Sequence, residues 1–414
     1  PLAMAGLAAM AVAYILSQFF RSFLAVIAPT LTAELGAGAA ALGTASGAWF
    51  LAFAAMQIPV GLALDRIGPR RTASVVFGLG AGGGAALFAA AQGEAQIIAA
   101  MAVIGAGCAP AMVASLYIFA RAFDPARFAF LTSTLVGVGT AVGNLGAAAP
   151  LAWAAEAYGW RAAMAGLCAA ALAVAGLAYA LLRDPPRADG GDGDAGLREL
   201  ASILRLPGLW PILALAFATY MAPAGIRGLW AGPWFAEVHG LGLGPIGDLT
   251  TLMALGMAAG AFAYGPLDRW LNTRKWVNAT GNALTAACCA AFALLPAVGV
   301  ATGAAFFVAI GALGMSYGVV MAHGRALLLP HLVGRGVTLL TFVSMSGVGV
   351  GQAVTGRLAD RFVADDPAQG FTAVFAFYAA ALALATLVYL TSRDAPPLAE
   401  ARSATSHPGA KGSQ

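Results

Sequence analysis

Apolar runs long enough to cross a lipid bilayer follow one another along almost the whole chain, and short charged clusters separate them. A transmembrane helix needs about 20 consecutive apolar residues. Charged residues make up only 10% of the 414 residues, whereas about 25% is usual in a soluble protein. The runs do not alternate between apolar and polar residues, as the strands of a membrane barrel would. The sequence therefore predicts an all-α membrane protein.

We predict twelve transmembrane helices, and the loops between them predict their orientation. The spans lie near residues 5–31, 42–64, 72–92, 95–121, 129–153, 160–182, 209–235, 246–267, 276–295, 297–323, 336–358 and 371–391. Most of the 22 Lys and Arg residues then fall in the loops on one side. The positive-inside rule places those loops and both termini in the cytoplasm. Because Arg and Ala are abundant and Lys is rare, we expect a bacterial inner-membrane protein.

The two halves of the chain share an internal repeat. Residues that are unusual in an apolar chain recur at an offset close to 206 positions. The matched pairs are Tyr14 with Tyr220, Arg21 with Arg227, Leu64-Asp65-Arg66 with Leu267-Asp268-Arg269, and Asn144 with Gln352. Charges inside membranes are costly and rare, so the charged matches carry most weight. The repeat predicts two pseudo-symmetric six-helix bundles, a design in which substrate binds at the repeat interface.

The longest polar stretch gives the expected domain boundaries. We predict a first bundle at residues 1–182, a flexible cytoplasmic linker at 183–207, a second bundle at 208–395 and a disordered cytoplasmic tail at 396–414. The linker is rich in Asp, Gly and Pro, which favour flexible connections.

Residues 61–71 (GLALDRIGPRR) resemble the loop signature of the major facilitator superfamily. The resemblance extends over the whole chain and implies the major facilitator fold, with transport by alternating access. In that family the loop latches the two halves on the cytoplasmic side while the carrier faces outward. It implies latch residues at Gly61, Asp65, Arg66, Gly68, Arg70 and Arg71, with repeat copies at Asp268 and Arg269. We expect Asp65 to accept hydrogen bonds near Gly336, and Asp268 near Ala129.

A candidate substrate site follows from two arginines inside apolar spans. Arg21 shares one helical face with Tyr14 and Gln18. No Asp or Glu stands in the middle of any predicted span, so the arginines need water or an anion as a partner. The predicted substrate-binding residues are Arg21, Arg227, Tyr14, Gln18, Tyr220, Trp230, Asn144 and Gln352.

Two short segments indicate the class of substrate. Residues 21–31 and 227–238 are similar to the arginine-bearing segments of organophosphate/phosphate exchangers, in which two arginines clamp the substrate phosphate. The lysine and histidine that accompany those arginines in the exchangers have no counterpart here. The resemblance therefore leaves both a phosphate and a smaller or carboxylate-bearing anion open. We expect a secondary active transporter, acting as an antiporter by a rocker-switch mechanism.

Other interpretations stay open. In one, the arginines are structural and the chain exports drugs or metabolites. In another, Met253, Met257 and His323 carry copper, although methionine packing and a solvated histidine are the simpler expectation. No catalytic constellation is present in the sequence, so we expect no enzyme activity. We further expect no cofactor, no bound metal and no nucleic acid, with a small-molecule substrate and the lipid bilayer as the partners of a monomer.

Overall fold

The structure is a computed structural model that describes residues 2–184, 202–295, 297–328, 332–362 and 367–397, and in these residues it is helical without strands. The first half contains α1 (Leu2–Ser22), α2 (Leu24–Leu35), α3 (Ala39–Arg66), α4 (Pro69–Val76), the π-helical turn η1 (Phe77–Gly82), α5 (Gly83–Ala89), α6 (Glu94–Cys108), α7 (Pro110–Ala122), α8 (Pro125–Gly146), α9 (Ala149–Tyr158) and α10 (Trp160–Leu181).

The second half repeats this pattern. It contains the short turn η2 (Pro207–Leu209), α12 (Trp210–Thr219), α13 (Met221–Gly225), the π-helical turn η3 (Ile226–Trp230), α14 (Ala231–His239), α15 (Leu243–Trp270), α16 (Lys275–Leu294), α17 (Val300–Leu313), α18 (Tyr317–Ala326), α19 (Val333–Phe362) and α20 (Pro367–Tyr389). Most of the predicted linker and tail lies outside the described residues, so those boundaries stay a prediction.

The prediction of twelve spans is confirmed. Eleven stretches are long and apolar enough to cross a membrane, and the bent pair α1–α2 makes the twelfth. This pair bends by 49°. Pro29 explains the bend, because it has no N–H to bond the Ala25 carbonyl one turn earlier. The chain therefore forms the all-α membrane fold that the sequence predicts.

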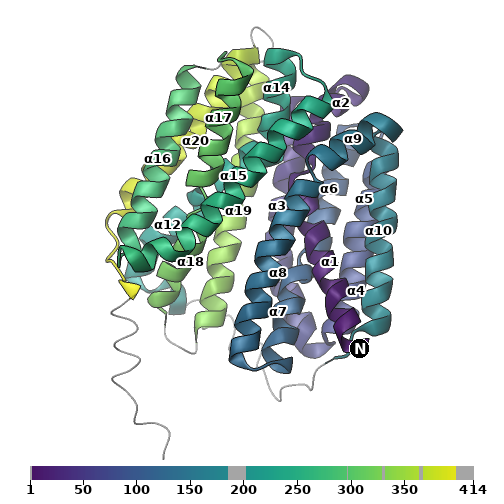
Figure 1. Cartoon of the computed structure of the whole chain (residues 1–414), viewed down its shortest axis with the longest axis vertical. Helices are drawn as coiled ribbons and strands as arrows, with labels where there is room; N and C mark the ends of the chain where they lie inside the picture. The colour runs from purple at the N-terminus through teal and green to yellow at the C-terminus, as the bar shows by residue number, and fades with distance from the viewer. Residues whose placement is uncertain (1, 185–201, 296, 329–331, 363–366, 398–414) are drawn as a thin grey trace, which may run out of the picture.

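The two six-helix groups lie side by side in Figure 1. We call the end where α1 begins and α20 ends the inner end, following the predicted orientation, and the opposite end the outer end. α3 and α19 form the most extensive helix pair in the molecule. They belong to different halves, so this pair joins the halves directly.

Glycines allow the halves to touch backbone to backbone toward the outer end. A Cβ at Gly43 of α3 would lie 2.6 Å from the Gln352 carbonyl oxygen and from the Gly356 Cα of α19. A Cβ at Gly232 of α14 would lie 1.7 Å from the oxygen of Ala25, the carbonyl that Pro29 leaves free. Near the top of Figure 1, α15 approaches α9 in the same way, through Gly247. The outer halves of the spans are therefore closely packed across the interface.

Candidate functional site

Arg227 connects the two halves at mid-span. It lies in η3 of the second half and is 1% exposed. Its Nη2 donates to the Asn144 carbonyl oxygen at 2.7 Å, and its Nη1 donates to the Ser22 carbonyl oxygen at 3.4 Å. Both acceptors belong to the first half. In this conformation the guanidinium therefore binds main-chain carbonyls, whereas the sequence led us to expect it to face a cavity.

The π-helical turn η3 places this arginine. Pro223 cannot donate to the Thr219 carbonyl, and the helix widens into a π-helical turn three residues later. Two side chains from α19 bind this stretch of the helix. Gln352 Nε2 donates to the Gly225 carbonyl at 3.2 Å, and Trp230 Nε1 donates to Thr355 Oγ1 at 3.0 Å. Gln352 and Trp230, predicted to bind substrate, thus support the helix that carries Arg227.

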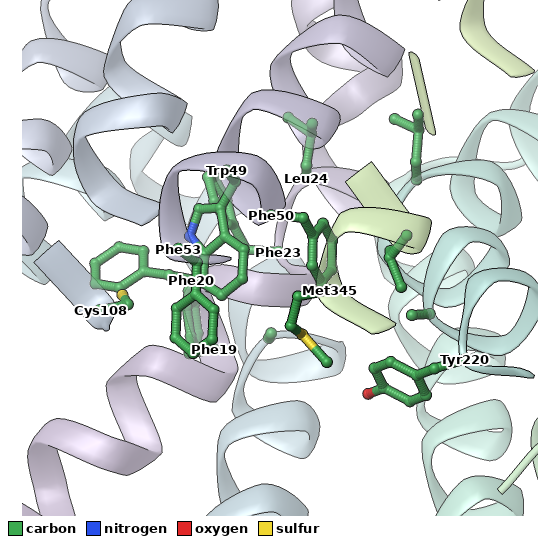
Figure 2. Close-up of a cluster of buried hydrophobic side chains, with 14 of the residues drawn as sticks. Phe19, Phe20, Phe23, Leu24, Trp49, Phe50, Phe53, Cys108, Tyr220 and Met345 are labelled. Carbon is green, nitrogen blue, oxygen red and sulfur yellow. The ribbon is translucent and has the colours of Figure 1, made fainter. Parts of the chain in front are cut away.

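Arg21 has a different environment. It lies on α1 half-buried, and its guanidinium carbon is 5.4 Å from the ring centre of Trp49 and 5.3 Å from that of Phe53. These rings belong to the aromatic cluster of α1 and α3 in Figure 2, which also contains Phe20 and Phe23. The Arg21 Nε atom is buried without a hydrogen-bond partner. Among the described residues, no carboxylate forms an ion pair with Arg21.

Three more of the predicted site residues, Tyr14, Gln18 and Asn144, form hydrogen bonds within the first half. Gln18 Nε2 donates to Tyr14 Oη at 2.5 Å, and Tyr14 Oη lies 3.1 Å from Thr140 Oγ1 of α8. Asn144 Oδ1 accepts a hydrogen bond from Ser22 Oγ at 3.0 Å.

Tyr220 of the second half packs against a second tyrosine. Its ring packs against Tyr317 with centres 5.7 Å apart. Arg21, Tyr14 and Tyr220 all lie within electrostatic range of the Tyr317 hydroxyl. We call Arg21, Tyr14, Tyr220 and Tyr317 the central site. The sequence predicted three of its members. Tyr317 is a polar residue on a predicted cavity helix, but it was not among the predicted substrate-binding residues.

The aspartates of the two loop signatures bind within their own halves in this structure. Asp65 pairs with Arg121 at 3.7 Å, and Asp268 pairs with Arg274 at 3.5 Å. The expected contacts near Gly336 and Ala129, across the halves, are not the ones these carboxylates make here. Arg66, Arg71 and Arg269 are exposed, and Gly61 has open space around it.

The loop glycine Gly68 has a clear structural reason. Its φ is +99°, and a Cβ there would lie 2.8 Å from the Asp184 carboxyl group. Asp184 Oδ1 accepts a hydrogen bond from the Arg70 N–H at 2.7 Å, at the start of α4. Arg70 Nε donates to the Tyr179 carbonyl. Gly68 and Arg70 therefore fasten the loop to the end of α10.

The solvated position expected for His323 is wrong. Its side chain is 0% exposed, and both ring nitrogens lie within hydrogen-bond distance of a neighbour. Met253 and Met257 are buried against Gly311. We expected solvation because His323 stands close to Arg325, which is exposed, near the end of a span. Burial of a helix end depends on which neighbours extend past it.

An apolar groove opens between the halves toward the inner end. It has a volume of about 440 Å³ and is lined by α8 and by Phe262 of α15. A second groove of about 510 Å³ lies within the first half, between α1, α7 and α8. The groove at Phe262 is thus on the opposite side of the membrane midplane from the close glycine contacts.

Two six-helix halves that meet around mid-span arginines, one buried and one half-buried, are typical of a class of polytopic membrane transporters. The Major Facilitator Superfamily model matches residues 10–324, and the chain belongs to this family. Comparison with curated proteins finds no match.

Solved structures of transporters share the fold. A D-xylose–proton symporter superposes with a TM-score of 0.77 at 14% identity, covering 94% of this chain and 98% of that one. A bacterial homologue of the human lysosomal transporter Spinster, in an inward-facing and unoccupied conformation, gives 0.73 at 20% identity, with 96% and 99% covered. A nucleoside transporter gives 0.72 at 10% identity, with 94% and 99% covered.

Proposed function

We propose that this chain is a secondary active carrier of a small anionic solute. The observation that carries the proposal is the state of Arg21. Its guanidinium lies in the middle of a span with an unpaired Nε, and no carboxylate in the described part of the chain pairs with it. An unneutralised charge in a membrane interior is costly, and an anion that binds it removes that cost. Arginine suits phosphate and carboxylate groups because its donors form a planar fork.

Arg227 has a second part in this proposal. It is tied to the Ser22 and Asn144 carbonyls, so it closes the interface beside Arg21. A rocker-switch movement that separates α1 and α8 from η3 breaks these bonds. The guanidinium is then free to bind the same anion. The carrier thus exchanges carbonyl bonds for substrate bonds during its cycle.

The arrangement of the halves supports alternating access. Backbone contacts at Gly43 and Gly232 close the outer part of the interface, while Asp65 and Asp268 leave the cytoplasmic latch unformed. We infer that the structure is an inward-facing state of a bacterial inner-membrane protein with cytoplasmic termini. In the outward-facing state Asp65 and Asp268 bind the opposite half. Exchange of one anion for another is the expected mode, with a monomer as the working unit.

The apolar groove favours one alternative. Its lining residues around Phe262 are almost all apolar, which would suit an exporter of bulky apolar molecules with structural arginines. The two functions differ in what binds at Arg21, and a binding experiment separates them.

Ligand-induced thermal stabilisation of the purified protein tests the proposal. Inorganic phosphate, succinate and an uncharged rhodamine-type dye serve as probes. A ligand at 100 times its Kd adds about 2.7 kcal/mol to the stability of the folded state. We expect stabilisation by an anion in the wild type and its loss in Arg21→Gln. Stabilisation by the dye alone, unchanged in Arg21→Gln, would favour the exporter.

A further inference from the structure

A set of buried polar side chains runs through the second half, outside the central site. We call it the polar chain, and its members are Thr219, Ser316, Asn282, Asn278, Tyr389 and His323, all 0% exposed. Thr219 Oγ1 lies 3.0 Å from Ser316 Oγ, which also accepts a hydrogen bond from Asn282 Nδ2 at 3.0 Å. Asn282 Nδ2 also reaches the main-chain oxygen of Asn278 at 2.9 Å. Hydrogen bonds therefore connect α12, the residue before α18 and α16, and the last of these bonds ends on the Asn278 main chain.

The end of the polar chain at His323 has a defined direction. His323 Nε2 lies 2.9 Å from the Arg393 carbonyl oxygen, and Nδ1 lies 2.6 Å from Tyr389 Oη. A carbonyl only accepts, so Nε2 carries a hydrogen. In the neutral ring, Nδ1 must then accept the hydrogen of the Tyr389 hydroxyl. The Tyr389 oxygen in turn accepts from Asn278 Nδ2 at 3.1 Å.

Protonation of His323 reverses this direction. Nδ1 then carries a hydrogen and donates to Tyr389 Oη, so the tyrosine hydroxyl must donate to a different acceptor. Asn278 supplies one, because its Oδ1 atom is buried without a partner. Rotation of the Asn278 amide exchanges its oxygen and nitrogen and presents Oδ1 to Tyr389. Asn278 therefore serves both protonation states of His323, each with its own arrangement of hydrogen bonds.

His323 is the group in this region that we expect to change its protonation near neutral pH. Charged groups stand at the inner ends of the packed helices and in the segment after α20. Asp394, Arg274 and Lys275 act on the ring electrostatically, and Arg393 contributes its main-chain carbonyl. The other charged residues at these helix ends are Asp268, Arg269, Arg335 and Arg325. α12 and α20 carry no charged residue. Asp268 pairs with Arg274, and Asp394 binds the start of α16. Neither carboxylate hydrogen-bonds the ring, and histidine is the side chain that titrates near neutral pH.

We propose that His323 is a proton-binding site of this carrier and that the polar chain transmits its protonation to the central site. The far end of the polar chain makes this connection. Thr219 precedes Tyr220, and Ser316 precedes Tyr317, so both bonded hydroxyls adjoin the two tyrosines of the central site. Asn282 binds the main-chain oxygen of Asn278, whose side chain binds Tyr389. A shift of Asn278 that follows the protonation of His323 therefore reaches both hydroxyls through this part of α16. This inference rests on the proposed carrier function and names a proton as the coupled ion.

The test measures conformation and needs no substrate. Spin labels are placed at Ala122→Cys and Leu271→Cys, exposed positions at the inner ends of opposite halves, in a protein whose four native cysteines are replaced by alanine. Distances between the labels are recorded from about pH 5 to about pH 8, a range centred on the ordinary pKa of histidine. We expect the wild-type distribution to shift within this range. His323→Gln keeps hydrogen-bonding capacity but cannot titrate, and its distances should not change with pH.

Two further variants keep the test decisive. His239→Gln, at the outer end of α14, is the matched control and should behave like the wild type. Tyr389→Phe keeps the imidazole but removes its partner, so the midpoint of the shift should move by about one pH unit. A wild type without a pH response, or a full response in His323→Gln, would overturn the proposal. So would an unchanged midpoint in Tyr389→Phe. Failure of anion binding affects none of these readings, so the two proposals fail separately.

Discussion

At the scale of single residues, two arginines at matching positions of the repeat have unlike environments. Arg227 is fully buried and donates to two carbonyls of the opposite half. Arg21 lies against the rings of Trp49 and Phe53 and keeps an unpaired donor. Contact with aromatic faces offsets part of the cost of a cation without using its hydrogen-bond donors. We therefore assign the first contact with the substrate to Arg21.

A single carboxylate after the last span offers a test of local stability. Burial raises the pKa of the Asp394 carboxyl group, but hydrogen bonds from the Thr273 hydroxyl and the N–H groups of Lys275 and Arg274 lower it more. The pKa in the folded protein is thus below its ordinary value. Stability from this group is present above the ordinary pKa of 3.8 and is lost as the pH falls through the lower, folded value.

Two substitutions distinguish the effect of the hydrogen bonds that Asp394 accepts at the start of α16 from the effect of its negative charge. Asp394→Ala removes a helix cap and should cost about 1 kcal/mol at neutral pH. Asp394→Asn keeps a hydrogen-bond acceptor and should cost less stability. In both variants the loss of stability that comes from protonation of Asp394 at acid pH should be absent. Thermal unfolding between about pH 6 and pH 3 measures both effects. The exposed Asp248→Asn is the control. An Asp394→Asn protein with unchanged acid dependence would refute the assignment.

At the scale of helices, the pairing of α3 with α19 decides which side of the interface is closed. Glycines on both helices bring the backbones together at Gly43 and Gly47, facing Gly356 and Gly349. Small residues at helix contacts allow such close packing in membranes, where the hydrophobic effect does not drive helices together. The contact therefore depends on the absence of side chains.

We expect Gly43→Ala to weaken this closed contact. The added Cβ would lie 2.6 Å from the backbone of α19, and overpacking of this kind costs about 1–3 kcal/mol. If the cost applies only to the inward-facing state, the outward-facing population rises by about 5-fold to 150-fold. Labelling from the outer side of a cysteine at Ala353 of α19, which faces Gly47 in the closed contact, measures this population. Gly83→Ala, which has open space for its Cβ, should leave labelling unchanged. Equal labelling in both variants would contradict this role of Gly43.

At the scale of the whole molecule, sequence was sufficient for the fold and insufficient for the contacts. Apolar runs determine the spans, because each run must satisfy its own backbone in lipid. The partners of Arg227 depend on how closely η3 approaches α1 and α8, which local pattern does not encode. The burial of His323 depends on Tyr389 and Arg393, which follow it by 66 and 70 residues. Helical spans depend on neighbouring residues and could be predicted, whereas contacts between residues far apart in the sequence could not.

The latch remains a prediction about the state opposite to this one. In the structure Asp65 pairs with Arg121 of its own half, and the Asp65 side chain in this pair is 63% exposed. Exposed pairs of this kind contribute about 0–1 kcal/mol. Contact with a helix N-terminus in the outward-facing state is worth about 0.3–2 kcal/mol. Asp65→Asn should therefore raise the inward-facing population, read from distances between the inner ends. A population equal to that of Asp248→Asn would argue against the latch.

The central claim is that Arg21 binds an anion during transport. Counterflow into proteoliposomes tests it most directly, using as the labelled solute whichever of phosphate and succinate stabilises the purified protein more. The account predicts accumulation in the wild type, a sharp fall in Arg21→Lys, because lysine lacks the planar fork of donors, and none in Arg21→Gln, with all three proteins folded. Full accumulation in folded Arg21→Gln would contradict the account.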